Sequence, residues 1–249
     1  MSKSKSHIIV LITFFAFNLI SIPNIIDIKD SWKFISQIPY HCKTIGAIAP
    51  FSKKTAKSIF KSLLPEINSK NGQKLMFLEV GPGSGGLSEY FVKKLDKLNI
   101  NYQLDLVELN EELYKVLVQK FANNPQVNVY CSDIIDWETS NKYNVIVSTL
   151  PFNCTFFTNK IVSNIINKYE QLSAQNCCIV CAEYALVGNI YKLFLSEQDK
   201  IEYEKKHNTL DKFKNRNETK KEIVLANLPP TYLFLSKIIE QQNISEHQT

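Results

Sequence analysis

Leu-Met-Phe-Leu-Glu-Val-Gly-Pro-Gly-Ser-Gly-Gly-Leu-Ser-Glu, from Leu75 to Glu89, is the stretch that decides the fold. The chain has seven glycines, and four of them fall within six residues here: Gly81, Gly83, Gly85 and Gly86. An apolar run, Leu75 to Val80, precedes the glycines, and an amphipathic run follows them. The pattern predicts a strand, a tight turn and a helix start, in which the backbone approaches a nucleotide-like ligand closely.

Two ligand classes use a turn of this kind. Gly81, Gly83 and Gly86 satisfy the dinucleotide pattern G-x-G-x-x-G, which is a weak signal alone. Glu79 with Gly81, Gly83 and Gly85 satisfies E-x-G-x-G-x-G, the first motif of class I methyltransferases that use S-adenosylmethionine (SAM). A glycine-rich turn without a ligand is the third interpretation, and the downstream sequence has to decide between them.

The composition indicates a globular protein in a reducing compartment. The chain has 249 residues, an apolar fraction of 45% and a net charge of +5, which suits anionic membranes or nucleic acid without requiring either. Cys178-x-x-Cys181 lies inside the apolar run Cys177 to Ala182, so we expect a buried strand with free thiols. No second ligand pair accompanies it, and we predict no metal site.

The N-terminus carries Lys3 and Lys5, followed by a mostly apolar run from Ile8 to Ile22. As a helix this run is about 22 Å long, shorter than the ~30 Å hydrocarbon core of a bilayer. We favour a retained membrane-associated helix over a signal or transit segment and over a buried helix. The predicted organisation is an apolar segment (1–30), a catalytic domain (31–240) and a polar tail (241–249).

Acidic residues follow the next two predicted strands. Glu108 ends the strand Gln103 to Val107, in the position of a ribose-hydroxyl acceptor. Asp133 follows the strand Val127 to Cys131, where a carboxylate can accept from an adenine amino group. The strand Val145 to Val147 then runs into Ser148-Thr149-Leu150-Pro151-Phe152 at the usual ligand edge.

The remaining pattern completes an α/β fold. Helices are predicted over Glu111 to Phe121 and Lys160 to Leu172, a strand over Cys177 to Tyr184, and a hairpin from Glu222 to Leu228 and Tyr232 to Leu235. A further helix begins after Ser52 and ends at Pro65. The fold class is therefore a doubly wound, seven-stranded, mostly parallel sheet, a Rossmann-like methyltransferase fold with a C-terminal antiparallel hairpin.

These motifs lie in the order and spacing of class I SAM-dependent methyltransferases, which the chain resembles. More closely it resembles the bacterial phosphatidylethanolamine N-methyltransferases. These share a tryptophan (Trp32) before a G-A-I-x-P-x-S loop (Gly46 to Ser52), S-x-L-P after strand four (Ser148 to Pro151), a tyrosine closing strand five (Tyr184) and a late N-L-P-P (Asn227 to Pro230). The L-P-aromatic at strand four is also similar to the related rRNA adenine dimethyltransferases.

One departure separates the chain from the rRNA enzymes. Those enzymes read N-L-P-Y or N-I-P-Y, and their asparagine oxygen accepts from the target amino group, whereas this chain has Thr149 there. The resemblance therefore implies a SAM-dependent N-methyltransferase acting on a phospholipid head-group amine such as phosphatidylethanolamine. The alternatives are a relative of the rRNA adenine N6-dimethyltransferases, a SAM-binding module without catalysis and an NAD-dependent oxidoreductase.

The resemblance also implies site residues. The cofactor SAM is expected to contact Glu79, Gly81, Gly83, Gly85, Glu108, Asp133, Ser148, Leu150 and Pro151. Aromatic faces stabilise a methylated ammonium product, and the catalytic candidates are Tyr184, Tyr40 and Phe152, with Phe51 as a fourth aromatic. Core packing is the competing interpretation for each ring, and the loop of Gly46 to Ser52 is either a lid or a packing loop.

The expected partners follow from the substrate. We expect a phospholipid substrate and an anionic membrane surface, no nucleic acid, and a monomer at the cytoplasmic face of a membrane. The lysine-rich segment from Lys200 to Lys221 is a solvated loop between strands five and six, a contact for anionic lipid, or a contact for RNA phosphate.

Overall fold

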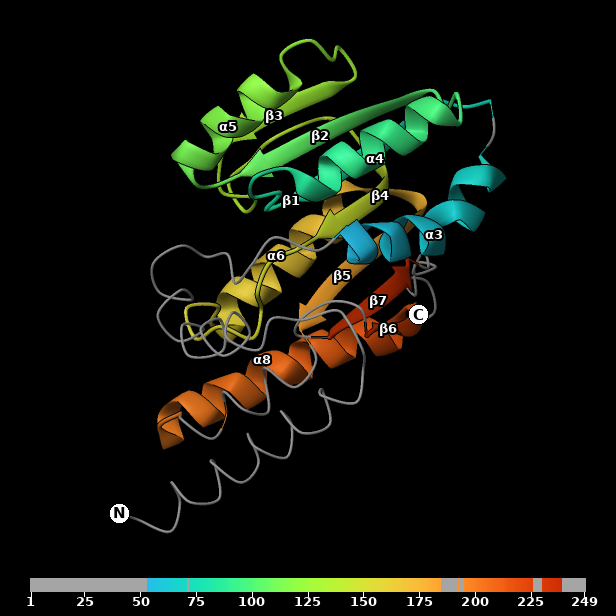
Figure 1. The fold of residues 1–249 in the computed structure, drawn as a ribbon. Coiled ribbons are helices and arrows are strands. Elements are labelled where there is room, and N and C mark those ends of the chain that lie inside the picture. Colours follow the sequence, from blue (N-terminus) through green and yellow to red (C-terminus); the bar gives the residue numbers. More distant parts are fainter. Residues whose placement is uncertain (1–52, 71, 185–191, 193–194, 226–229, 239–249) are drawn as a thin grey trace, which may run out of the picture. The chain divides into compact units, whose positions relative to one another are not determined.

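The computed structural model describes residues 53–70, 72–184, 192, 195–225 and 230–238. These residues form a seven-stranded sheet in the order β3-β2-β1-β4-β5-β7-β6 (Figure 1). The strands are β1 (Leu75–Val80), β2 (Tyr102–Glu108), β3 (Val127–Cys131), β4 (Tyr143–Ser148), β5 (Ser173–Tyr184), β6 (Glu218–Val224) and β7 (Thr231–Lys237). The first five are parallel, while β7 runs antiparallel to both β5 and β6. The predicted fold class, including the terminal hairpin, is confirmed, but the first strand of the hairpin is Glu218–Val224 and not the predicted Glu222 to Leu228.

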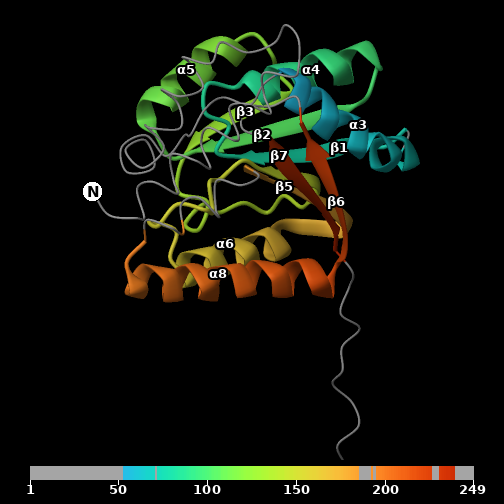
Figure 2. The ribbon, with the colours of Figure 1, turned by 60° about the horizontal axis from the view of Figure 1, so that its bottom comes forward.

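Helices cover both faces of the sheet, as Figure 2 shows. One face carries α3 (Lys53–Ser69), α4 (Gly86–Lys97) and α5 (Glu111–Phe121), and the other carries α6 (Asn159–Leu172) and α8 (Glu197–Arg216). Phe91 of α4 is the centre of the first interface, since its ring meets Phe60 of α3 at 5.4 Å and Phe77 of β1 at 6.4 Å, both edge to face.

The register of the parallel strands aligns their carboxyl ends. Val80 of β1 pairs with Val107 of β2 and with Ser148 of β4, and Glu108 pairs with Cys131 of β3. The glycine turn, Glu108 and the segments after β3 and β4 therefore leave the sheet at one edge, here called the carboxyl edge. In open α/β sheets this edge is where ligands bind.

The helix α3 differs from the prediction, because it continues through Pro65 to Ser69. A proline inside a helix removes one backbone hydrogen bond and strains the preceding turn. The apolar row nevertheless extends past it, and Ile67 is 1% exposed in the core. Burial of that side chain offsets the local cost, so the helix does not end at Pro65.

The lysine-rich segment also differs from the prediction, because its part up to Arg216 forms α8 rather than a solvated loop. Ser196 caps the helix by accepting from the backbone N–H of Asp199. Tyr203, Leu210 and Phe213 recur at helical spacing and are buried. These three side chains, with the exposed Ile201 as the fourth apolar residue of the helix, were too sparse a signal among so many charges.

Cysteines 177, 178 and 181 lie on β5 as buried free thiols, as predicted. Burial raises the pKa of the Cys178 thiol to about 11, so it stays protonated and unreactive at neutral pH. Among the described residues, no three metal-ligating side chains come together.

The predicted apolar segment (1–30) and the loop of Gly46 to Ser52 lie outside the described residues, as does Asn227 to Pro229. Within the described part of the chain, no helix has the length and apolar character that crossing a bilayer requires.

Candidate functional site

The glycine turn brings three secondary-structure elements close together. A Cβ atom on Gly81 would lie 2.9 Å from Leu150 Cδ2, and one on Gly85 would lie 2.7 Å from Leu117 Cδ2 of α5. Gly83 is different: its φ is +59°, and a Cβ atom there would meet none of the described residues within 4 Å. Two glycines thus permit close packing of the protein, whereas the third leaves open space along the backbone, the arrangement a close-lying ligand requires.

Glu108 lies directly beside that open space. One carboxylate oxygen accepts from the Gly83 N–H and the other from the Asn110 N–H, both at 2.9 Å. The side chain is 7% exposed. A carboxylate has about four acceptor positions, so two remain for hydroxyl donors of a bound ligand. This geometry suits the predicted role as a ribose acceptor.

Glu79 is a buried carboxylate with an unfilled oxygen. It is 3% exposed, and Oε2 accepts from the Ser88 hydroxyl at 2.7 Å. No described residue donates to Oε1. Burial raises the Glu79 pKa to about 7; the Ser88 hydrogen bond opposes this shift and the nearby Glu108 charge adds to it. Buried polar atoms are normally paired, so the orphan oxygen indicates a donor that a ligand would supply.

Asp133 sits in the turn after β3. Its Oδ1 accepts from the backbone N–H of Ile135 at 2.9 Å, which fixes the side chain at the carboxyl edge. The second oxygen receives no hydrogen bond from the described residues, so it is available to an amino group. Its contact with an adenine stays a prediction.

The end of β4 contributes through its backbone and Leu150. Ser148 is 1% exposed, and its hydroxyl accepts from Tyr169 of α6 at 2.8 Å, so this side chain is engaged within the protein. Thr149 donates to the Gly81 carbonyl at 2.6 Å and ties β4 to the glycine turn. Leu150 contacts Gly81, and Pro151 follows half-buried.

The aromatic candidates have unequal support. Phe152 is 2% exposed and packs edge to face on Phe157 at 5.3 Å, which favours core packing over contact with a substrate. Tyr184 closes β5, where its backbone pairs with Thr231, but its side chain lies outside the described part. Tyr40 and Phe51 also lie outside it. A catalytic role for these residues stays a prediction.

The loop after β4 is held by α8, a feature that the sequence did not reveal. Lys206 is 1% exposed and donates to the Cys154 carbonyl at 2.6 Å. Burial lowers its pKa to about 8, opposed by the nearby Glu202. Glu202 also accepts from the Asn159 N–H at 2.6 Å, and Thr209 donates to the Asn159 side chain at 2.7 Å. The helix and the loop form one hydrogen-bonded unit at the carboxyl edge.

We expect Lys206→Met to lower turnover about tenfold while leaving SAM affinity within about twofold. The methionine keeps the apolar stem but removes a charge-assisted hydrogen bond of ~1.5–3 kcal/mol that positions the loop beyond Leu150. Steady-state kinetics and calorimetry measure the two quantities. Lys205→Met is the matched control, because the neighbouring Lys205 is exposed and should affect neither. Equal turnover in both variants would show that the loop needs no such anchor.

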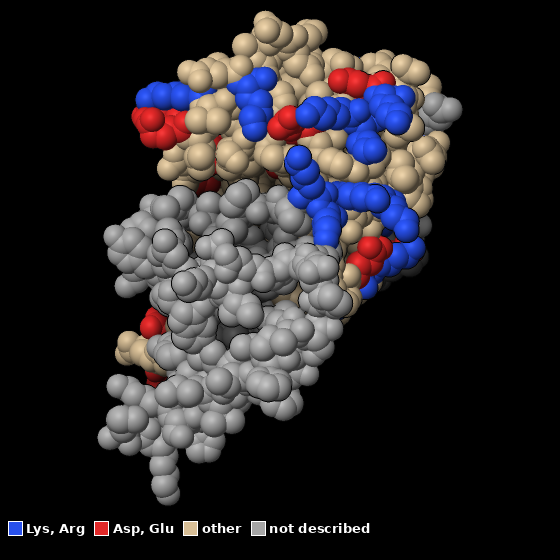
Figure 3. Space-filling model, in the orientation of Figure 1, with Lys and Arg blue, Asp and Glu red and all other residues tan. Residues whose placement is uncertain are grey.

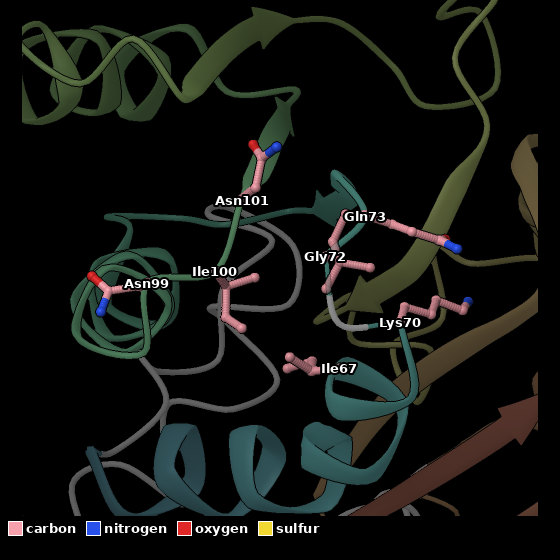
Figure 4. Close-up of a pocket in the computed structure, with 8 residues that line it drawn as sticks. Ile67, Lys70, Gly72, Gln73, Asn99, Ile100 and Asn101 are labelled. Atoms are coloured by element: carbon pink, nitrogen blue, oxygen red, sulfur yellow. The ribbon is translucent and has the colours of Figure 1, made fainter.

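A separate small pocket lies at the other end of the strands (Figure 4). It is lined by residues at the end of α3, the start of β1 and the turn before β2, among them Lys70, Gly72, Asn99 and Asn101. Lys70 is paired with Glu66 at 2.9 Å. Because β1 begins here, this pocket is at the edge opposite the glycine turn and is distinct from the candidate site.

The acceptor groups and the open backbone at the glycine turn fit the predicted cofactor. The open backbone at Gly83 suits a ligand that lies close to the turn, Glu108 keeps free acceptor positions for hydroxyls, and the Glu79 carboxylate lacks a donor. SAM carries a ribose and an α-ammonium group, which supply those donors.

Comparison with known proteins agrees with this assignment. The model of the ribosomal RNA adenine dimethylase family matches residues 51–190, more than half of the chain. Ribosomal RNA small subunit methyltransferase A of Pseudomonas fluorescens is 33% identical over 101 residues, which cover 38% of this chain and 34% of that protein. A malonyl-[acyl-carrier protein] O-methyltransferase of Priestia megaterium is 29% identical over 132 residues, covering 53% and 44% respectively. The chain spans less than half the length of these curated relatives.

Solved structures resemble the chain in fold. The N-methyltransferase NodS of Bradyrhizobium japonicum has a TM-score of 0.51 at 13% identity, covering 76% of this chain and 99% of that one. Its complex with S-adenosyl-L-homocysteine has a TM-score of 0.51 at 12% identity, covering 85% and 98%. At such identities the likeness concerns the fold alone.

The fold and the cofactor site together define a class I SAM-dependent methyltransferase. Within that class, the chain belongs to the ribosomal RNA adenine dimethylase family, as the family match over residues 51–190 establishes.

Proposed function

We propose that the protein methylates the amine of a phospholipid head group, such as phosphatidylethanolamine, at the cytoplasmic face of a membrane. The proposal departs from the family's name at one point, the acceptor. Its support comes from the end of β4, which borders the glycine turn, and from the sequence resemblance to bacterial phosphatidylethanolamine N-methyltransferases.

The observation that carries the proposal is the hydrogen bond from Thr149 to the Gly81 carbonyl at 2.6 Å. Adenine methylation in the rRNA enzymes uses an asparagine oxygen at this position to accept from the target amino group. Thr149 has no amide oxygen to offer, and its hydroxyl, which keeps its acceptor lone pairs, is held against the turn by this bond. The position therefore serves the geometry of the turn and leaves an adenine amino group without its usual acceptor.

The burial of Phe152 also supports a lipid amine over adenine as the acceptor. An enzyme that acts on a base must stack the flipped base on an exposed side-chain face. Phe152 follows Pro151 at the correct place, but it is 2% exposed and covered by Phe157. A small aliphatic amine requires no such stacking surface.

The reaction demands positioning more than acid–base catalysis. SAM, when bound, supplies an electrophilic methyl group, whose bond to sulfur breaks as the neutral amine forms the new N–C bond. Glu79 and Glu108 hold the ligand at the turn, and the unit of α8 and the loop after β4 orders one wall of the acceptor side. The head-group ammonium first loses a proton to water or a nearby acceptor, and Tyr184 and Tyr40 are the proposed contacts for the methylated ammonium that forms.

N6-methylation of adenine in small-subunit rRNA is the second candidate. The family match and the Pseudomonas relative favour it specifically. The two candidates share the cofactor site and differ only in the acceptor.

The test is methyl transfer from labelled SAM by the full chain. One reaction contains vesicles of phosphatidylethanolamine with an anionic lipid, and a parallel reaction contains unmodified small-subunit rRNA. We expect label in the lipid fraction, recovered as mono- or dimethylated head group. Label in the rRNA with none in the lipid would replace our proposal with the second candidate.

A further inference from the structure

The helix α3 presents a row of lysines that the sequence analysis did not single out. Lys53, Lys57 and Lys61 are spaced by four residues and exposed, so they share one face of the helix, and the exposed Lys54 lies beside them. We call these four residues the α3 lysine surface. Figure 3 shows Lys and Arg side chains gathered over α3 and the adjacent α4.

No described acidic residue neutralises the α3 lysine surface. The single acid of α3 is Glu66, three turns away from Lys54, and it pairs with Lys70 at 2.9 Å and Lys237 at 3.9 Å. Within the described ranges, none of the four lysines forms an ion pair or a hydrogen bond. Their positive charge is therefore directed to solvent.

Helix stability does not account for these lysines. The first turn of α3 contains Lys53 and Lys54 and no acid. Cations near a helix N-terminus oppose the macrodipole, and like charges four residues apart repel each other. An arrangement unfavourable for the isolated helix, kept on an exposed face, indicates an anionic partner.

Contacts of α3 place the lysine surface relative to the site. Glu66 meets Lys237 at the end of β7, while Ser62 donates to Glu222 near the middle of β6 at 2.6 Å. Because β6 runs parallel to β5 through their shared partner β7, it ends at the carboxyl edge. The helix thus runs from the opposite edge at its C-terminus to the carboxyl edge at Lys53.

Exposed apolar side chains occur at the same edge. Leu109 follows β2 and is 68% exposed, Phe156 lies in the loop after β4 and is 41% exposed, and Leu225 follows β6 and is 73% exposed. Exposed lysines on one helix and exposed apolar side chains at the carboxyl edge together suit the interface of an anionic bilayer, where phosphates attract the charges and the hydrocarbon accepts the apolar groups. RNA would use the lysines, and its bases could stack on Phe156, but it would leave Leu109 and Leu225 without a partner.

We propose that the α3 lysine surface docks the protein on an anionic bilayer, with the carboxyl edge and its cofactor site facing the lipid. This inference rests on the proposed lipid acceptor and specifies how that acceptor is reached. The proposed contact with anionic lipid is therefore on α3 and not on α8. Three basic residues of α8 already have partners within the protein: Lys206 donates to the Cys154 carbonyl, Lys214 pairs with Glu183 and Arg216 pairs with Glu170.

The test compares two triple variants of the full chain that change net charge equally. Lys53→Gln, Lys57→Gln and Lys61→Gln remove the row on α3. Lys160→Gln, Lys205→Gln and Lys212→Gln remove three exposed lysines from α6 and α8, on the other face of the sheet. Flotation is measured with neutral phosphatidylcholine vesicles and with vesicles containing phosphatidylglycerol, at low and high salt.

We expect the α3 variant to bind anionic vesicles roughly 100-fold more weakly than the wild type at low salt, with the difference shrinking at high salt. Binding to neutral vesicles and the behaviour of the α6/α8 variant should change little. Equal losses in both variants, or no loss in either, would overturn the inference. So would a selective loss of binding to single-stranded RNA with vesicle binding intact.

A second measurement separates this inference from the proposed function. In detergent-dispersed phosphatidylethanolamine no bilayer has to be reached, so the α3 variant should methylate at the wild-type rate. If the wild type fails on dispersed lipid while selective flotation persists, the acceptor assignment is wrong and the docking surface stands. If dispersed lipid is methylated but flotation is unaffected, only the docking surface is wrong.

Discussion

Replacing Gly83 by valine is expected to weaken SAM binding at least 100-fold, which corresponds to roughly 2.7 kcal/mol. Among the described residues, no atom lies within 4 Å of a Cβ atom at Gly83, so the branched side chain would extend into the space that the cofactor must occupy. The substitution also displaces the backbone N–H that donates to Glu108 at 2.9 Å. Calorimetric titration with SAM measures the loss.

Gly72→Val is the matched control for that measurement. Gly72 also has a positive φ, +85°, and open space around its Cβ position, but it lies at the opposite edge of the sheet. Both variants should lose about 1–2 kcal/mol of stability from the left-handed backbone conformation, so thermal unfolding should shift similarly. SAM affinity should fall only for Gly83→Val. Unchanged affinity in that variant would remove the cofactor from the turn.

The bounds of β1 and β3 could be predicted because each of these strands gives a strong local signal, whereas β6 begins four residues before the predicted Glu222. Leu75 to Val80 and Val127 to Cys131 are bounded by turn residues, and the observed β1 and β3 have the predicted bounds. The helix α5 has the predicted bounds, and in the structure Asn110 caps it by accepting from the Leu113 N–H. These signals need no knowledge of distant contacts.

The extents of α3 and α8 could not be predicted, because they depend on tertiary burial. Pro65 is a local stop signal that the packing of Ile67 overrides. In α8, Lys206 occupies a core position as a charged residue, and its burial is offset by the Cys154 carbonyl, the Tyr203 ring and the nearby Glu202. A sequence pattern does not contain those partners.

In the site, residue types were predictable but side-chain directions were not. Glu108 lies where the motif places it, next to Gly83. Ser148 and Phe152 belong to the same motif, yet β4 is buried on both faces, so alternation could not indicate which way Ser148 points. The structure turns it to Tyr169. The raised pKa of Glu79 could not be predicted either, because the burial of its carboxylate and the missing donor to Oε1 arise only in the packed fold.

The buried Glu79 carboxylate makes the folding stability of the ligand-free protein depend on pH. The Glu79 pKa is about 7 in the folded protein and near the ordinary 4.5 in the unfolded chain. Between these values the folded state binds more protons, so stability falls as pH rises from 4.5 through 7. Above pH 7 the free energy of unfolding is lower by on the order of 3 kcal/mol than below pH 4.5, at 1.36 kcal/mol per unit of pKa shift.

Glu79→Gln should remove this pH dependence. The amide can still accept from Ser88, and any constant cost of burying it cancels when the variant is compared with itself at two pH values. We expect the free energy of unfolding of the variant, relative to the wild type, to rise by about 2–3 kcal/mol between pH 5 and pH 8. Urea unfolding at both pH values, without SAM, measures it.

Glu89→Gln provides a contrast of opposite sign. Hydrogen bonding to Lys93 lowers the pKa of Glu89, so its carboxylate stabilises the fold above pH 4.5 and its removal should not stabilise the variant at high pH.

With SAM present, the wild type should gain more stability at pH 8 than Glu79→Gln does, because the ligand donates to the vacant Oε1 of Glu79. A relative stability of Glu79→Gln that stays constant from pH 5 to pH 8 would mean that Glu79 ionises freely, and the orphan oxygen would then no longer point to a ligand donor.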